Sequence, residues 1–143
     1  IIPLLAYPVQ RRFCIIKGDQ RDSERNLAFI FSIISYIIGA LIAVSFNIPP
    51  LQKVIYITYF FSGVFMVISN YILNIKASGH MCGFVGPMAL VMYILGGVGY
   101  FTVIILILII WSSLFLKRHK PSDLIVGSII PIVSMFLSIL III

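Results

Sequence analysis

The stretch "LAFIFSIISYIIGALIAVSF", residues 27–46, contains no charged side chain. A helix that crosses a bilayer needs about 20 apolar residues, which is close to the length of this run. Similar or slightly shorter apolar runs follow it, and the first residues of the chain, about 1–10, resemble the end of a further span. The other predicted spans cover residues 51–73, 81–95, 100–116 and 124–143. Because these runs are apolar on every side, they predict helices and not barrel strands, and hence an all-α integral membrane protein.

The composition supports one membrane domain over residues 1–143. Hydrophobic residues make up 62% of the chain and charged residues only 10%, so a soluble domain is excluded. No linker or internal repeat divides the sequence, and nothing in it sets an oligomeric state. Since the first residue is Ile1 and not methionine, we expect the chain to begin within a longer product.

The formal net charge of +6 is distributed unevenly between the predicted loops. Successive loops alternate between the two membrane faces, so residues 11–26, 74–80 and 117–123 share one face, the basic face. Nine of the ten Lys and Arg residues lie on it, and only Lys53 lies on the other. The positive-inside rule therefore predicts that the basic face is cytoplasmic. Membrane lipids or a phosphorylated lipid are the expected partners, and nucleic acid is not.

The histidines and acids gather on the same face. His80 and His119 both fall on the basic face, as do Asp123 and the three acids of the loop 11–26. Ionisable groups beside membrane helices are costly, so their convergence predicts a functional site. A metal site built from the two histidines and Asp123 is an alternative, but the spacing matches no zinc motif, and we expect no metal or cofactor. Cys14 and Cys82 are expected to be unpaired.

The segment "SSLFLKRHKPSDLIVG", residues 112–127, places His119 four residues before Asp123. If a helix begins near Pro121, its first turn holds Asp123, where the helix dipole favours a carboxylate. A histidine just before that turn can donate one ring N–H to the carboxylate, which leaves its other nitrogen free as a nucleophile.

Through these residues the sequence resembles the type 2 phosphatidic acid phosphatase superfamily. Its members are membrane lipid phosphatases that are related in fold to vanadium haloperoxidases. That family carries three motifs: K-x6-R-P, P-S-G-H and S-R-x5-H-x3-D. Ser78-Gly79-His80 matches the core of the second motif, and Ser112, His119 and Asp123 match the third at its spacing. The resemblance covers roughly residues 70–130 by motif. It implies a six-helix bundle, of which the first span is truncated here.

The resemblance also implies two-step phosphoryl transfer without a metal. His119 would attack phosphorus with Asp123 orienting it, and His80 would protonate the leaving oxygen and then activate water. Lys76, the Ser78 hydroxyl and the Gly79 amide would hold the phosphate oxygens. The implied substrates are isoprenoid phosphates, phosphatidate and phosphatidylglycerol phosphate, which the sequence does not separate.

The sequence departs from the family pattern at one proline and at the positions of the basic residues. Ala77 replaces the usual proline, Ser113 stands at the third-motif arginine, and K-x6-R-P is missing. Arg21 and Arg25, four residues apart, could supply the guanidinium groups that suit phosphate, and Lys117 is a further candidate. These departures keep two alternatives open: a catalytically inactive relative that binds or transports phosphorylated lipids, and a small structural membrane subunit. Gly39, Gly63, Gly86 and Gly127 are expected to permit close helix contacts.

Overall fold

The computed structural model describes residues 5–13, 19–116 and 120–143, apart from the side chains of residues 6, 7, 20–22, 25 and 98. All regular structure in this part of the chain is helical, so the prediction of an all-α fold is confirmed. The elements are α1 (Ala6–Phe13), α2 (Gln20–Ser45), α3 (Pro50–Val67), the π-helix η2 (Ile68–Ile72), α4 (Gly79–Leu95), the 3₁₀ helix η3 (Gly96–Phe101), α5 (Thr102–Phe115) and α6 (Pro121–Ile142).

Each long apolar run forms a helix, with differences at the ends. Helix α2 begins at Gln20, before the apolar run, because the polar residues that follow can continue a helix in water. The glycine-rich segment after α4 forms the 3₁₀ helix η3. Asn26–Ser45, Pro50–Ile72 and Pro121–Ile142 are long and apolar enough to cross a membrane, whereas Gly79–Leu95 and Gly99–Phe115 are shorter apolar helices.

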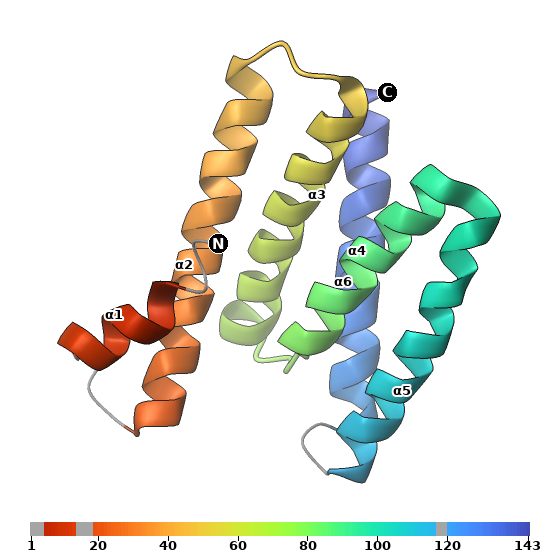
Figure 1. The fold of residues 1–143 in the computed structure, drawn as a ribbon. Coiled ribbons are helices and arrows are strands. Elements are labelled where there is room, and N and C mark those ends of the chain that lie inside the picture. The colour runs from red at the N-terminus through yellow and green to blue at the C-terminus, as the bar shows by residue number, and fades with distance from the viewer. Residues whose placement is uncertain (1–4, 14–18, 117–119) are drawn as a thin grey trace.

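Helix α6 occupies the centre of the bundle. It packs against α3 on one side and α4 on the other, while α2 lies outside α3 and α5 contacts α4 (Figure 1). Met81 and Val85 of α4 form a buried cluster with Leu124 of α6, and side chains of α5 pack on that cluster. The short helix α1 contacts α2. The described part of the N-terminal stub is thus a helix of 8 residues against α2, and whether it ends a further span stays a prediction.

Glycines bring α2 and α3 into close contact through two aromatic rings. A Cβ added at Gly63 would lie 2.9 Å from Cδ2 of Tyr36, and one at Gly39 would lie 3.0 Å from Cδ1 of Tyr56. Each helix therefore places a tyrosine ring over a glycine of the other. This is the close approach expected of small residues between apolar helices.

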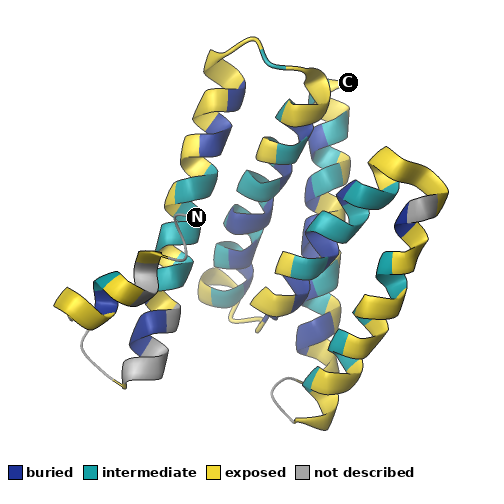
Figure 2. Ribbon diagram, viewed as in Figure 1, coloured by how far each residue is buried: buried dark blue, intermediate teal, exposed yellow. Residues whose placement is uncertain are grey.

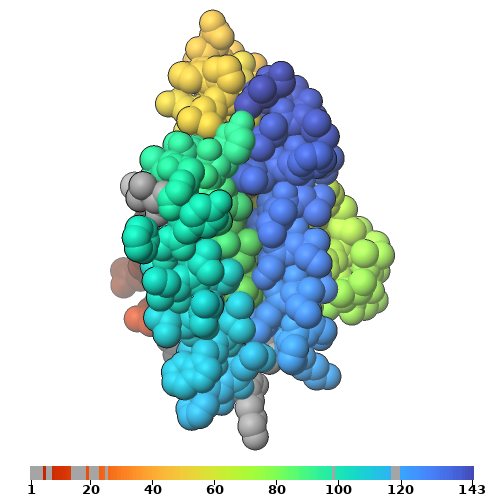
Figure 3. Space-filling model, turned by 90° about the vertical axis from the view of Figure 1, so that its right-hand side faces the viewer, coloured from red at the N-terminus to blue at the C-terminus, as the bar shows by residue number. Residues whose placement is uncertain are grey.

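Exposed residues lie along much of the outside of the bundle (Figure 2), and many of them are large hydrophobic residues. Helix α5 has no buried residue, and Trp111 and Phe115 on it are 64% and 72% exposed. In the view of Figure 3, α5 and α6 form much of one face of the molecule. Ile107 on α5 and Ile129 and Phe136 on α6 are also exposed. Exposed apolar surface on this scale indicates contact with lipid or with another protein.

The described loops alternate between the two ends of the bundle. The start of α2, the segment between η2 and α4 and the start of α6 lie at one end, which carries the predicted basic face (Figure 1). The α2–α3 connection and η3 lie at the other end. The starts of α4 and α6, which carry Ser78–His80 and Asp123, therefore lie at the same end of the bundle.

Candidate functional site

The segment that leads to the second motif begins at a π-helical turn. The Leu73 N–H donates to the Ile68 carbonyl, which gives the wider turn that is often found at functional sites. Asn74 follows with a φ of 54°, a left-handed conformation that asparagine tolerates better than most residues. This reversal takes the chain away from α3 and toward the start of α4.

Ser78 is the N-cap of α4. Its backbone is extended, its side chain is fully buried, and its Oγ accepts a bond from the Met81 N–H at 3.4 Å. Gly79 and His80 form the exposed first turn of the helix. Capping by the Ser78 hydroxyl satisfies one of the free N–H groups of that turn. A hydrogen bond from the Ser78 hydroxyl to a phosphate oxygen stays a prediction.

The start of α6 is capped in a similar way. Pro121 occupies the first turn, where its missing N–H costs nothing. The Lys120 N–H donates to Oδ2 of Asp123 at 3.2 Å, and the Ser122 hydroxyl lies 3.3 Å from Oδ1. Asp123 is buried, and its position in the first turn was predicted correctly. The carboxylate thus helps to fix the backbone immediately after His119.

One backbone hydrogen bond joins the two motif segments. The Ser78 N–H donates to the Asp123 carbonyl at 2.9 Å. Gly127, one turn further along α6, makes this approach possible, because a Cβ there would lie 2.5 Å from the Ser78 carbonyl oxygen. Two segments that are more than forty residues apart in the sequence are therefore in direct contact.

The electrostatics at this point favour an anion. The N-termini of α4 and α6 carry the positive ends of their helix dipoles, and both lie beside the Ser78–Asp123 hydrogen bond. Lys76 and Lys120 are exposed on the same two segments. The Asp123 carboxylate already lies at the N-terminus of α6, so the dipole of α4 and the two lysines are the features that favour an added anion, and phosphate binding stays a prediction.

Several predicted site residues lie outside the described part of the chain. Residues 117–119, which include His119 and Lys117, are among them, so their predicted roles stay predictions. Arg21 and Arg25 lie on α2 one helical turn apart, within a segment that was predicted as a loop, and their side chains are outside the description. Among the described residues no three His, Cys, Asp or Glu side chains form a group that could hold a metal.

An ion pair holds α1 against α2 at the same end of the bundle. Nε of Arg11 lies 2.8 Å from Oε1 of Glu24, which is almost buried. This hydrogen bond and the negative charge of Glu24 raise the pKa of the Arg11 guanidinium. Arg11 thus balances Glu24, one of the acids of the loop 11–26.

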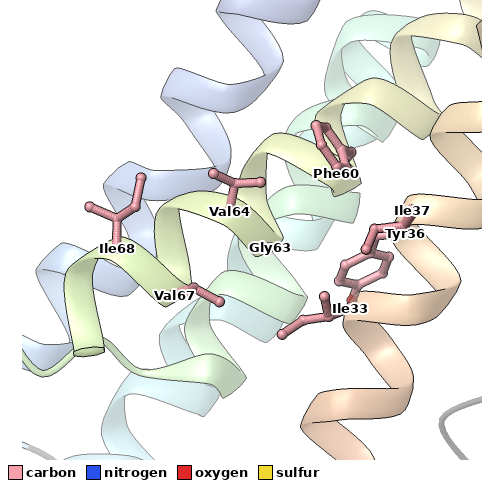
Figure 4. A pocket seen from close by; sticks show the side chains of 8 residues that line it. All are labelled: Ile33, Tyr36, Ile37, Phe60, Gly63, Val64, Val67 and Ile68. Atoms are coloured by element: carbon pink, nitrogen blue, oxygen red, sulfur yellow. The ribbon is translucent and has the colours of Figure 1, made fainter. Parts of the chain in front are cut away.

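An apolar cavity of about 170 Å³ lies between α2 and α3 (Figure 4). Residues of the two helices line it, among them Gly63 of α3 and Tyr36 of α2, whose ring lies against Gly63. It extends along α3 to Ile68, the first residue of η2, at the basic face. The cavity can accept an apolar chain and offers almost no polar contact.

Sequence reasoning missed Ser69 and Asn70 as residues of this region. The Ser69 hydroxyl donates to the Ile75 carbonyl at 2.9 Å, and the Asn70 side chain bonds both Met66 and Ala77. The feature that could have indicated them in the sequence is a polar Ser-Asn pair near the end of the largely apolar run 51–73.

None of the family models, curated proteins or solved structures compared with this chain matches it.

Proposed function

We propose that this chain is a multi-pass membrane phosphatase that hydrolyses a lipid phosphate or pyrophosphate, as a divergent member of the type 2 phosphatidic acid phosphatase superfamily. The Ser78–Asp123 hydrogen bond carries the proposal, because it brings the "SGH" segment and the start of α6 together. Contact between these two segments is what a shared active site of His80 and His119 requires.

The proposed reaction has two steps and needs no metal. A ring nitrogen of His119 attacks the terminal phosphorus, a P–N bond forms, and the P–O bond to the leaving group breaks as His80 gives its proton to the leaving oxygen. The leaving group is the lipid alcohol for a monophosphate and the lipid monophosphate for a pyrophosphate. His80 then takes a proton from water, the resulting hydroxide attacks phosphorus, and the P–N bond breaks to release inorganic phosphate. The dipoles of α4 and α6 and the charge of Lys76 stabilise the negative charge on the phosphate oxygens.

The lipid part of the substrate explains the apolar surroundings of the site. The helices long enough to cross a membrane and the exposed apolar side chains support a position within the bilayer. The cavity between α2 and α3 is a suitable place for part of the lipid tail. We place the site at the cytoplasmic face, on the distribution of Lys and Arg.

Phosphate release by the purified protein tests the proposal. The substrates are an isoprenoid phosphate, an isoprenoid pyrophosphate, phosphatidate and phosphatidylglycerol phosphate in detergent micelles. We expect at least one to be hydrolysed, and the His80→Ala and His119→Ala variants to lose at least about 100-fold in rate. Turnover that His119→Ala leaves at the wild-type level would refute the mechanism.

A second candidate is an inactive relative that binds phosphorylated lipids. Its support is the half-buried Ser113 on α5, which stands where the family has an arginine and offers only a hydroxyl. Saturable binding of lipid phosphates without phosphate release would favour it. Replacing Ser113 by arginine would then test whether the missing cation is the cause.

A further inference from the structure

We infer that Asn70 is a positioning residue that holds the His80 segment against the start of α6. The inference rests on the proposed phosphatase function, because it concerns how that site keeps its geometry. Asn70 lies in η2, outside the motifs, and its side chain makes two hydrogen bonds. Its Nδ2 donates to the Met66 carbonyl at 2.9 Å, and its Oδ1 accepts from the Ala77 N–H at 3.0 Å.

Only one orientation of the Asn70 amide satisfies both partners. The Met66 carbonyl can only accept a hydrogen bond and the Ala77 N–H can only donate one, so the amide must point Nδ2 at the first and Oδ1 at the second. The side chain therefore links the end of α3 to the residue directly before Ser78. It fixes the distance between them across seven residues of sequence.

Other contacts show that the same segment is held from several sides. The Ser69 hydroxyl donates to the Ile75 carbonyl and the Ile75 N–H donates to the Ser69 carbonyl. The Ala77 side chain is buried in a cluster with Met66 and Ile130. Asn70 is the residue whose side chain joins this support to the backbone next to Ser78.

The hydrogen bond between the Ala77 N–H and Asn70 is possible because residue 77 is alanine and not the proline that the resemblance would lead us to expect. Proline, the usual residue there, restricts its own backbone but has no N–H to donate. Ala77 is free of that restriction and supplies the N–H that Asn70 accepts. The side-chain hydrogen bond thus restrains the backbone just before the Ser78 cap.

Displacing this segment would move His80 relative to the phosphate and to His119. A shift of about 1 Å in a reacting group can cost about 100-fold in rate. Loss of the Asn70 bond should therefore lower kcat much more than it changes KM. A residue that only stabilised the fold would lower the folded fraction and leave kcat per folded molecule unchanged.

The test compares Asn70→Leu, Asn70→Asp and the control Asn47→Leu. Leucine keeps the size of the side chain and removes both hydrogen bonds, whereas aspartate keeps an acceptor for the Ala77 N–H. Asn47 is exposed at the opposite end of the bundle. For each variant, kcat, KM and hydrogen exchange of the 74–82 segment are measured on folded protein in the same detergent.

We expect Asn70→Leu to lower kcat about 10–100-fold with a similar KM and to speed exchange at Ala77 and Ser78. Asn70→Asp keeps the acceptor for the Ala77 N–H but sets a carboxylate oxygen against the Met66 carbonyl, so it should recover only part of both losses. If the wild type is active and Asn70→Leu matches Asn47→Leu in kcat, the inference is wrong and the proposed function stands. If no lipid phosphate is hydrolysed, the proposed function fails, and hydrogen exchange alone tests whether Asn70 holds the 74–82 segment in place. Unchanged exchange in Asn70→Leu overturns that role, and faster exchange supports it.

Discussion

Replacing Gly127 by alanine should separate the two motif segments. The new Cβ would lie 2.5 Å from the Ser78 carbonyl oxygen and 3.0 Å from the Ser78 backbone nitrogen. Both neighbours are backbone atoms, so they cannot swing away as the end of a flexible side chain could. One of the segments must move, and the Ser78–Asp123 hydrogen bond of 2.9 Å must lengthen or break.

The size of the effect follows from three contributions. Overpacking of a close contact costs about 1–3 kcal/mol, and the weakened backbone hydrogen bond adds up to about 1 kcal/mol. Alanine has a higher helix propensity than glycine, and this offsets about 1 kcal/mol of the lost free energy of unfolding. The Gly127→Ala variant should therefore lose about 0–3 kcal/mol in free energy of unfolding. Its turnover should fall about 100-fold if a shift of about 1 Å reaches the site.

Gly83 provides a matched control on the neighbouring helix. It is exposed in α4, and a Cβ there would meet no atom within 4 Å. Gly83→Ala should therefore keep wild-type turnover and gain up to about 1 kcal/mol. The assay is unfolding in detergent micelles followed by circular dichroism. Equal stability and turnover in the two alanine variants would refute the close contact at Gly127.

Three further predictions concern the ends of the bundle and the chemistry. Glu24→Gln should remove the ion pair with Arg11 and make α1 more sensitive to trypsin, which mass spectrometry of the early fragments can detect; unchanged cleavage would contradict this. A cysteine at exposed Ser122, with Cys14 and Cys82 replaced, should not react with an impermeant reagent in intact cells, and rapid labelling would reverse the orientation. EDTA should leave phosphate release unchanged, whereas inhibition that added metal restores would indicate a metal site.

The sequence predicted the helices well because their signal is local. A run such as residues 27–46 has only one way to satisfy its backbone in an apolar medium, and it forms a helix. The polar start of α2 at Gln20 could not be read from hydropathy, since polar residues that face water can continue a helix or leave it. The π-helical turn at Ile68–Ile72 is equally hidden, because it depends on one shifted hydrogen bond.

The site was only partly predictable for a different reason. The spacing from His119 to Asp123 and the "SGH" segment indicated which residues to consider, and the structure brings Ser78 and Asp123 into contact. The support given by Asn70 and the contact at Gly127 depend on packing between helices that are distant in sequence. The predicted phosphate contacts of Arg21 and Arg25 depend on side-chain positions and stay predictions.

The most direct measurement is the detection of phosphate bound to His119. The purified protein is mixed with a lipid phosphate labelled at phosphorus, quenched in alkali within the first turnover, digested and mapped by mass spectrometry. The account predicts a base-stable, acid-labile phosphate on His119, which disappears on a chase with unlabelled substrate and is missing from His119→Ala. Steady phosphate release without any phosphate on His119, or a phosphate found on another residue, would contradict it.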